Sequence, residues 1–223
     1  MRIILTANVA SSLYWLGRYL QRVESTLQKM LEAYDLIIDV DSEAGSTLYK
    51  HFGIDIHYTG AMDFLNEAIL GEHHANLVNV ITNARENAII SRTNIDTNAF
   101  GEIMELYALF QRAQKSSETI DYKFIDTVQS LISEIWGATV KREHQIEGDV
   151  FFRLGKLVEE LDFNCRFGSD EKTNTLIVDK IQTIIEIIDA HHCLNDQELT
   201  LVASDPYKIF TIITQKINTI IVL

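Results

Sequence analysis

The chain has 223 residues, of which 47% are apolar and 23% charged, so its composition is that of a folded globular protein and not of a disordered one. A formal net charge of −13 would repel a phosphate backbone, which argues against a nucleic-acid partner. Because one core can bury most of the apolar side chains at this length, we expect residues 1–223 to form a single domain.

The cysteines and the most apolar stretch bear on where the chain is found. Two cysteines, Cys165 and Cys193, are too few for a disulfide framework, and MRIILTANVASS lacks the features of a secretory signal, so we expect a cytoplasmic protein. The stretch IFTIITQKINTIIVL is interrupted by Gln215, Lys216 and Asn218 before it reaches the roughly 20 residues of a membrane span. We therefore predict no membrane segment and a buried core helix at this place.

Apolar residues recur every three or four positions along most of the chain, and a single proline, Pro206, leaves little to break helices. This pattern predicts an all-α, single-domain bundle of about seven to nine mostly antiparallel helices. The predicted helices span 8–39, 61–70, 75–95, 100–114, 120–142, 145–167, 174–192 and 206–222, with shorter ones within 42–60 and 197–202. Asp205 before Pro206 is a start signal for the last of them. The β-branched segments IVDKIQTIIEII and INTIIVL also have strand propensity, which tertiary packing usually overrides.

One helical segment occurs twice. Residues 13–24, LYWLGRYLQRVE, return in a looser form 138 residues later as FFRLGKLVEELD, residues 151–162. In this register Gly17 corresponds to Gly155 and Glu24 corresponds to Asp162. Two copies predict a pair of related helices and not a solenoid.

Each copy places a carboxylate two turns after its glycine, on the flank of an apolar stripe. At about 100° per residue, Gly17 and Glu24 lie roughly 20° apart, whereas Arg18 and Arg22 point away from the stripe. A carboxylate at such a place is costly without a partner, and we expect Arg85 and Arg92 to supply one. Three interpretations stay open: an ion-pair network that fixes helix register, a ligand pocket, or a solvated face.

Catalytic and metal-binding signatures are missing from the sequence. Di-metal carboxylate bundles use Glu-x-x-His pairs, and the chain contains none. The adjacent histidines at 73–74 and 191–192 diverge by about 100° on a helix, so we predict no metal site. There is no glycine-rich nucleotide loop and no Gly-x-Ser-x-Gly elbow. We therefore predict no cofactor and no catalytic residue, with Cys165 as a core residue.

Three blocks resemble the bacterial alpha-E family of helical proteins: LYWLGRYLQRVE, NARENAIISR at 83–92, and FFRLGKLVEELDFNCR. The middle block is the most specific. The resemblance implies a polar centre, structural or ligand-binding, formed by Glu24, Arg85, Glu86, Asn87, Arg92, Asp162 and Arg166, with Gly17 and Gly155 as helix-packing residues. It also carries over Arg18 and Arg22. The chain departs from the family pattern at Gln21, where the family has Glu, and at Ile89, Lys156 and Glu160, where it has Arg.

The resemblance also implies a function. Alpha-E proteins are associated with circularly permuted ATP-grasp ligases, transglutaminase-like proteins and proteasome-like peptidases. We therefore expect a non-catalytic helical accessory protein whose partner is an ATP-grasp-type ligase or a related peptide-modifying enzyme. The alternative is an enzyme or small-ligand-binding bundle that uses the central Glu/Asp/Arg cluster. A homo-oligomeric structural protein is a third hypothesis.

Overall fold

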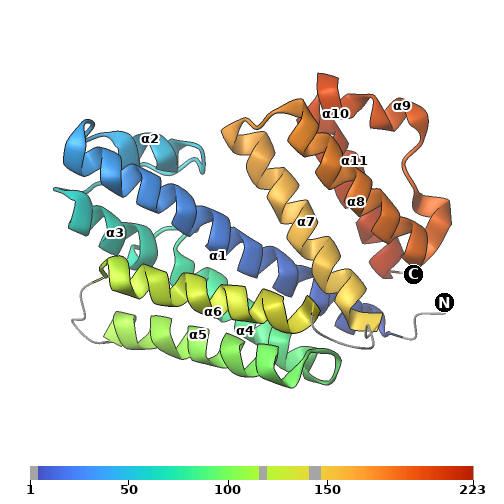
Figure 1. The fold of residues 1–223 in the computed structure, drawn as a ribbon, viewed down its shortest axis with the longest axis horizontal. Coiled ribbons are helices and arrows are strands. Elements are labelled where there is room, and N and C mark those ends of the chain that lie inside the picture. The colour runs from blue at the N-terminus through green and yellow to red at the C-terminus, as the bar shows by residue number, and fades with distance from the viewer. Residues whose placement is uncertain (1–4, 116–119, 141–146, 223) are drawn as a thin grey trace. The chain divides into compact units, whose positions relative to one another are not determined.

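The computed structural model describes residues 5–115, 120–140 and 147–222, and in these ranges every regular element is a helix (Figure 1). The predicted all-α bundle is confirmed. The α-helices are α1 (Ala7–Asp39), α2 (Ala44–Lys50), α3 (Ala61–Leu70), α4 (Leu77–Ile90), α5 (Thr97–Lys115), α6 (Tyr122–Val140), α7 (Glu147–Phe167), α8 (Glu171–Asp189), α9 (Asp196–Leu199), α10 (Leu201–Ser204) and α11 (Pro206–Val222). Two 3₁₀-helices, η1 (Arg92–Asn94) and η2 (Ala190–His192), follow α4 and α8.

The helix boundaries follow signals in the sequence. The helices predicted at 61–70 and 206–222 agree with α3 and α11. At the start of α11 the Asp205 carboxylate accepts a hydrogen bond of 3.1 Å from the backbone amide of Lys208, as the start signal predicts. IVDKIQTIIEII lies within α8, and the described residues of INTIIVL, 217–222, are helical in α11. Most of their isoleucines are buried, although Ile187 is 50% exposed, and this burial outweighs the local propensity.

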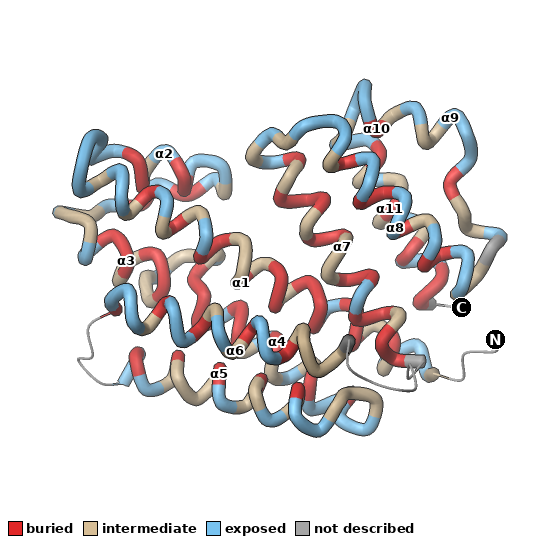
Figure 2. Tube along the Cα trace, viewed as in Figure 1, coloured by how far each residue is buried: buried red, intermediate tan, exposed pale blue. Residues whose placement is uncertain are grey.

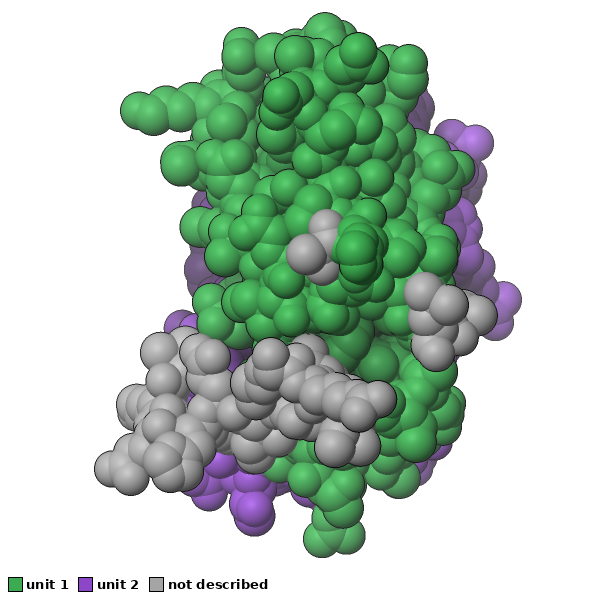
Figure 3. All heavy atoms as spheres, turned by 90° about the vertical axis from the view of Figure 1, so that its right-hand side faces the viewer, with its two compact units in different colours: residues 1–21, 87–95, 143–223 green, residues 22–86, 96–142 purple. Residues whose placement is uncertain are grey.

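Contacts divide the chain into two compact units, each assembled from segments that are distant in the sequence (Figure 3). Unit 1 consists of residues 1–21, 87–95 and 143–223, and unit 2 consists of residues 22–86 and 96–142. Two helices belong to both units: α1 divides after residue 21 and α4 divides after residue 86. That the whole chain behaves as one domain stays a prediction.

The core of unit 1 joins the first turns of α1 to α7, α8 and α11. Buried positions recur along α7 and α8 (Figure 2). The buried side chains of this core include Leu13, Tyr14, Phe151, Leu154, Leu161, Ile177, Ile181, Ile185, Ile209, Ile213 and Ile217. The C-terminal stretch is thus a buried core helix, as predicted. Among the described residues, no helix combines the length and apolarity that a bilayer crossing needs.

A tight turn connects α7 to α8. Gly168 has a φ of 72°, and its amide donates to the carbonyl oxygen of Asn164 over 2.9 Å, which closes the last turn of α7. The Asp170 carboxylate then accepts from the amide of Thr173 over 2.9 Å and caps α8. The two helices therefore run back along one another within the core of unit 1.

The core of unit 2 is built around aromatic side chains. The hydroxyl of Tyr49 donates to the carbonyl oxygen of Ala68 over 3.1 Å, and the Tyr49 ring packs against Phe64 with centroids 6.0 Å apart. Burial raises the pKa of Tyr49. The rings of Phe110 and Phe124 join α5 to α6 with centroids 5.4 Å apart. These two helices form an antiparallel pair (Figure 1).

We predict that thermal unfolding of the chain is one cooperative transition. Because α1 and α4 continue from one unit into the other, the loss of either unit would expose half of a helix that the other unit needs. Differential scanning calorimetry tests this through the ratio of the van't Hoff to the calorimetric enthalpy, which should be close to one. Two resolved transitions would show that the units unfold independently.

Candidate functional site

The two copies of the repeat cross within unit 1, glycine against backbone. An ideal Cβ built on Gly17 overlaps the carbonyl oxygen of Phe152 and lies 3.0 Å from the amide nitrogen of Lys156. An ideal Cβ on Gly155 overlaps the carbonyl oxygen of Tyr14 in the same way. Each glycine thus meets the residue three positions before the other glycine. Only a residue without a side chain allows α1 and α7 to approach this closely.

The close crossing brings Arg18 of α1 onto two carboxylates of α7. Its Nε donates to Oε2 of Glu159 over 2.7 Å, and its Nη2 donates to Oδ2 of Asp162 over 3.3 Å. The exposed fractions are 6% for Arg18, 3% for Glu159 and 5% for Asp162. Buried charges of this kind are stable only when they are paired and hydrogen-bonded, and the guanidinium fork can serve both acids at once.

Aromatic rings surround the same guanidinium. Its central carbon lies 5.0 Å from the ring centroid of Trp15 and 5.9 Å from those of Tyr14 and Phe210. Burial alone would lower the pKa of Arg18, but Glu159, Tyr14 and Asp162 outweigh burial and raise it. Burial raises the pKa of the Tyr14 phenol, although Arg18 opposes the shift. Both groups therefore keep their protons throughout the physiological pH range.

Asp162 also binds a second arginine. Nε of Arg166 donates to its Oδ1 over 3.1 Å, and Nη2 donates to its Oδ2 over 3.4 Å, one helical turn along α7. The Arg166 side chain is 42% exposed, whereas that of Asp162 is buried. We call Arg18, Glu159, Asp162 and Arg166 the Arg18 network. It contains two formal positive and two formal negative charges, so its charges balance internally.

Glu24, the carboxylate at the equivalent position in α1, lies in unit 2. Its Oε2 accepts a hydrogen bond of 3.0 Å from the indole Nε1 of Trp136 in α6. Glu24 is half-buried. The bond ties the second part of α1 to α6 and gives Trp136 the partner that a half-buried indole needs.

The middle sequence block, NARENAIISR at 83–92, covers the second half of α4 and the first residue of η1. Arg85, in unit 2, forms an ion pair with Glu86, and its guanidinium carbon lies 4.8 Å from the ring centroid of Tyr107 on α5. Glu86 is exposed. In unit 1, the carbonyl oxygen of Asn87 accepts from the hydroxyl of Ser91 over 2.6 Å, and Arg92 opens η1 with its side chain exposed.

The partners differ from those that the sequence led us to expect. We predicted that Arg85 and Arg92 would pair with the motif carboxylates, but the structure pairs Asp162 with Arg18 and Arg166, and Glu24 with Trp136. A helical wheel of α1 with one apolar face predicts that Arg18 points away from the core, and this prediction is wrong. The start of α1 has a second packed face, which α7 covers at Gly17 and Arg18.

Glu159 was not among the predicted site residues. The signal that could have found it lies in the repeat, because Glu159 follows Gly155 by four residues, as Gln21 follows Gly17. Residues four positions apart share a helix face, so a glutamate here must face whatever packs on Gly155. Because Gly155 packs on α1 at Gly17, the cation next to Gly17, Arg18, is the natural partner of this glutamate.

Potential metal ligands do not form a cluster in the described residues, and one of the two thiols is buried. In the described part of the chain, no three His, Cys, Asp or Glu side chains gather as metal ligands would. Cys165 is buried, and burial raises its pKa to about 11, so its thiol is a poor nucleophile. The Arg18 network can bind helices together through charge-assisted hydrogen bonds, which is the chemistry its geometry supports.

Comparison with known proteins gives one family. The family model Alpha-E, described as a predicted alpha-helical domain with a conserved ER motif, matches residues 5–200. No curated protein and no solved structure matches the chain. The chain contains no Glu-Arg dipeptide, because Gln21 precedes Arg22 where the family pattern of the first block has glutamate. In space, however, the buried pair of Arg18 and Glu159 joins these two residue types.

The glycine crossing predicts opposite effects for two pairs of Gly→Ala substitutions. Gly17→Ala and Gly155→Ala should each destabilise the fold by about 1–3 kcal/mol or more, because the new methyl group overlaps a backbone carbonyl. Gly101→Ala and Gly137→Ala are matched controls on α5 and α6, where an added Cβ has no neighbour within 4 Å. Each control should stabilise by up to about 1 kcal/mol through helix propensity.

Urea unfolding followed by circular dichroism measures all four variants. Equal effects at the two pairs of positions would contradict the close crossing of α1 and α7.

Removing Arg18 should be far more costly than removing an exposed arginine. Arg18→Met leaves two buried carboxylates short of their main cation and should reduce the free energy of unfolding by about 3–5 kcal/mol. Arg18→Lys keeps the charge but loses the fork, so its loss should be smaller. Arg112→Met, which breaks the exposed pair with Glu105, is the control and should cost about 1 kcal/mol or less. A loss at Arg18 no larger than at Arg112 would show that the network does not stabilise unit 1.

Proposed function

Because the chain belongs to the Alpha-E family, whose model matches residues 5–200, we propose that it is a non-catalytic helical accessory protein that docks on an ATP-grasp-type ligase or a related peptide-modifying enzyme. The resemblance of the motif blocks supports the choice of partner, since Alpha-E proteins are associated with such enzymes. As the cysteine usage predicts, we place this role in the cytoplasm.

The observation that carries the non-catalytic part of the proposal is the internal pairing of the Arg18 network. A general acid, base or electrophilic arginine must reach a substrate. Arg18, Glu159 and Asp162 are buried, and Arg18 forms an ion pair with each of the two acids. These interactions lie inside unit 1 and not at a substrate-accessible surface. This is the arrangement of a rigid scaffold.

Exposed apolar side chains support the docking part. On unit 2 the rings of Tyr34 and Tyr122 lie 5.9 Å apart, and the Tyr34 hydroxyl contacts the sulfur of Met62 at 3.4 Å. The Tyr122 side chain is 50% exposed, and Ile38, one turn beyond Tyr34 on α1, is 58% exposed. Aromatic residues and methionine are enriched in protein interfaces, so a surface of this kind favours a protein partner.

The alternative function, a ligand site lined by Glu24, Asp162, Arg85 and Arg92, has less support. It requires carboxylates that are available to a ligand, whereas Asp162 is buried against two arginines and Glu24 accepts from Trp136. Arg85 lies over the Tyr107 ring and forms an ion pair with Glu86. Each of these groups already serves the packing of its own unit.

The proposal is tested with the purified chain and the purified ATP-grasp-type ligase from the same organism. Sedimentation velocity should show a complex, and the rate of ATP turnover by the ligase should change when the chain is added. The double variant Ile38→Ser/Tyr122→Ser should weaken the complex, while its melting temperature stays close to that of the parent. Sedimentation of the two proteins as separate species, with ATP turnover unaltered, would overturn the proposal.

Glu24→Gln separates a structural carboxylate from a catalytic one. The glutamine oxygen can still accept from Trp136, so the free energy of unfolding should fall by only about 1 kcal/mol or less. Complex formation with the ligase should be unchanged. Trp136→Phe removes the donor and serves as the matched structural control. An unchanged stability with loss of ligase stimulation or of a bound small molecule would instead assign Glu24 a functional role.

A further inference from the structure

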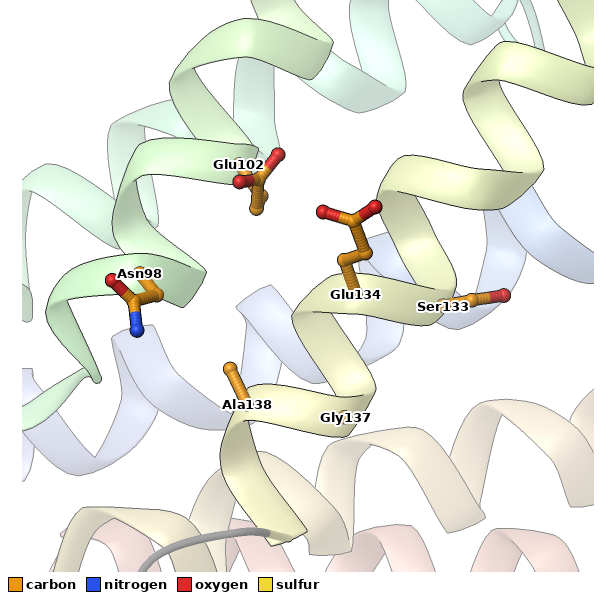
Figure 4. A pocket seen from close by; sticks show the side chains of 6 residues that line it. All are labelled: Asn98, Glu102, Ser133, Glu134, Gly137 and Ala138. Carbon is orange, nitrogen blue, oxygen red and sulfur yellow. The ribbon is translucent and has the colours of Figure 1, made fainter.

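Unit 2 has a groove between α5 and α6 that the Arg18 network does not use. Its volume is about 530 Å³. The lining residues are Asn98, Glu102, Ser133, Glu134, Gly137 and Ala138 (Figure 4). Asn98 and Glu102 stand one turn apart on α5, and the other four come from α6. An antiparallel helix pair normally fills such a groove with side chains, so the open space needs an explanation.

Among the described residues that line the groove, the two charged ones are both acidic. Glu102 and Glu134 come from opposite helices, and their carboxylates are turned toward one another in Figure 4. No described residue forms a hydrogen bond or an ion pair with either of them. Glu105, on the same helix as Glu102, is by contrast paired with Arg112 over 2.9 Å. Two facing carboxylates without a cation repel one another, and a positive charge between them would remove this repulsion.

Gly137 lines the groove without a side chain. A Cβ added at Gly137 has nothing within 4 Å, and the same holds for Gly101, next to Glu102. Glycine within a helix is unfavourable relative to alanine, and Gly17 and Gly155 are explained by the backbone that they touch. Packing inside the chain gives no such reason for Gly137. Its lack of a side chain does leave room for an incoming group beside the two glutamates.

We propose that this groove receives an arginine or lysine side chain from a basic segment of the protein partner. Charge complementarity supports this assignment, because the groove presents two carboxylates that no described residue pairs, on a chain of net charge −13. A guanidinium can bind carboxylates on both sides through separate N–H groups, and Asn98 supplies a further polar group at the α5 side. This assignment rests on the proposed docking function and adds the chemistry of the partner.

The first test uses a peptide in place of the partner. A 12-residue alanine-based helical peptide with two arginines at i and i+4 is titrated into ¹⁵N-labelled chain, with the citrulline peptide as its neutral isostere. The arginine peptide should shift the amide resonances of residues 98–102 and 133–138, and the citrulline peptide should bind at least about tenfold more weakly. Glu102→Gln/Glu134→Gln should lose the shifts.

Asp55→Asn/Asp126→Asn removes the same number of charges from exposed positions outside the groove and should keep the shifts. Equal shifts with citrulline, or shifts that survive in Glu102→Gln/Glu134→Gln, would overturn the proposal. Saturation of the same amides by Mg²⁺ or Ca²⁺ alone, with no displacement by the arginine peptide, would overturn it in favour of a cation site.

The second test separates the groove from the docking function. Glu102→Lys/Glu134→Lys should weaken the complex with the ligase at least about tenfold, and Asp55→Lys/Asp126→Lys should leave it unchanged. A ligase complex that is insensitive to the groove reversal would overturn the groove assignment while the docking function stands. If the groove binds the arginine peptide but the chain forms no complex with the ligase, the groove assignment stands and the docking function is overturned.

Discussion

The contact between the backbones of α1 and α7 at Gly17 and Gly155 is the constraint on which unit 1 depends. At this crossing neither helix can carry a Cβ, and the resulting closeness brings Arg18 against Glu159 and Asp162. A longer distance between the helices would separate Arg18 from Glu159 and Asp162 and leave the buried guanidinium without either carboxylate, at a cost of several kcal/mol. The glycines and the ion pairs therefore act together. The glycines set the distance between α1 and α7, and at this distance the ion pairs of the Arg18 network fix the register of α7 along α1.

The repeat explains why the crossing is reciprocal. Gly17 meets Phe152 and Gly155 meets Tyr14, so the two segments are related by an approximate twofold arrangement within unit 1. Under this relation Lys156 corresponds to Arg18, and Gln21 corresponds to Glu159. The first copy thus carries Arg18 and Gln21, and the second copy carries Lys156 and Glu159 at the corresponding positions. Only one of the two symmetry-related pairs therefore consists of an arginine and a glutamate. A guanidinium binds two acids at once more readily than an ammonium, so the stronger network forms on the Arg18 side.

Much of the fold could be predicted from the sequence, because helix periodicity and capping are local. The helix 206–222, with Asp205 as its cap, was found in full even though its β-branched residues also suit a strand. The partners within the site could not be predicted in the same way. A helical wheel with one apolar face sends Arg18 to solvent, and only the approach of α7 from far along the chain buries it. Likewise, nothing local in the sequence indicates that Trp136 reaches Glu24, because 112 residues separate the two. Contacts of this kind depend on tertiary packing, and the repeat was the one feature of the sequence that pointed to it.

A double-mutant cycle between Arg18 and Glu159 tests this account most directly. The free energy of unfolding is measured for Arg18→Met, Glu159→Met and the double variant. Each single substitution should cost about 3–5 kcal/mol, because it leaves buried charge behind, whereas the double variant replaces a buried pair by apolar side chains and should recover a large part of the loss. A double variant whose loss equals the sum of the two single losses would contradict the claim that the two residues stabilise unit 1 through one another.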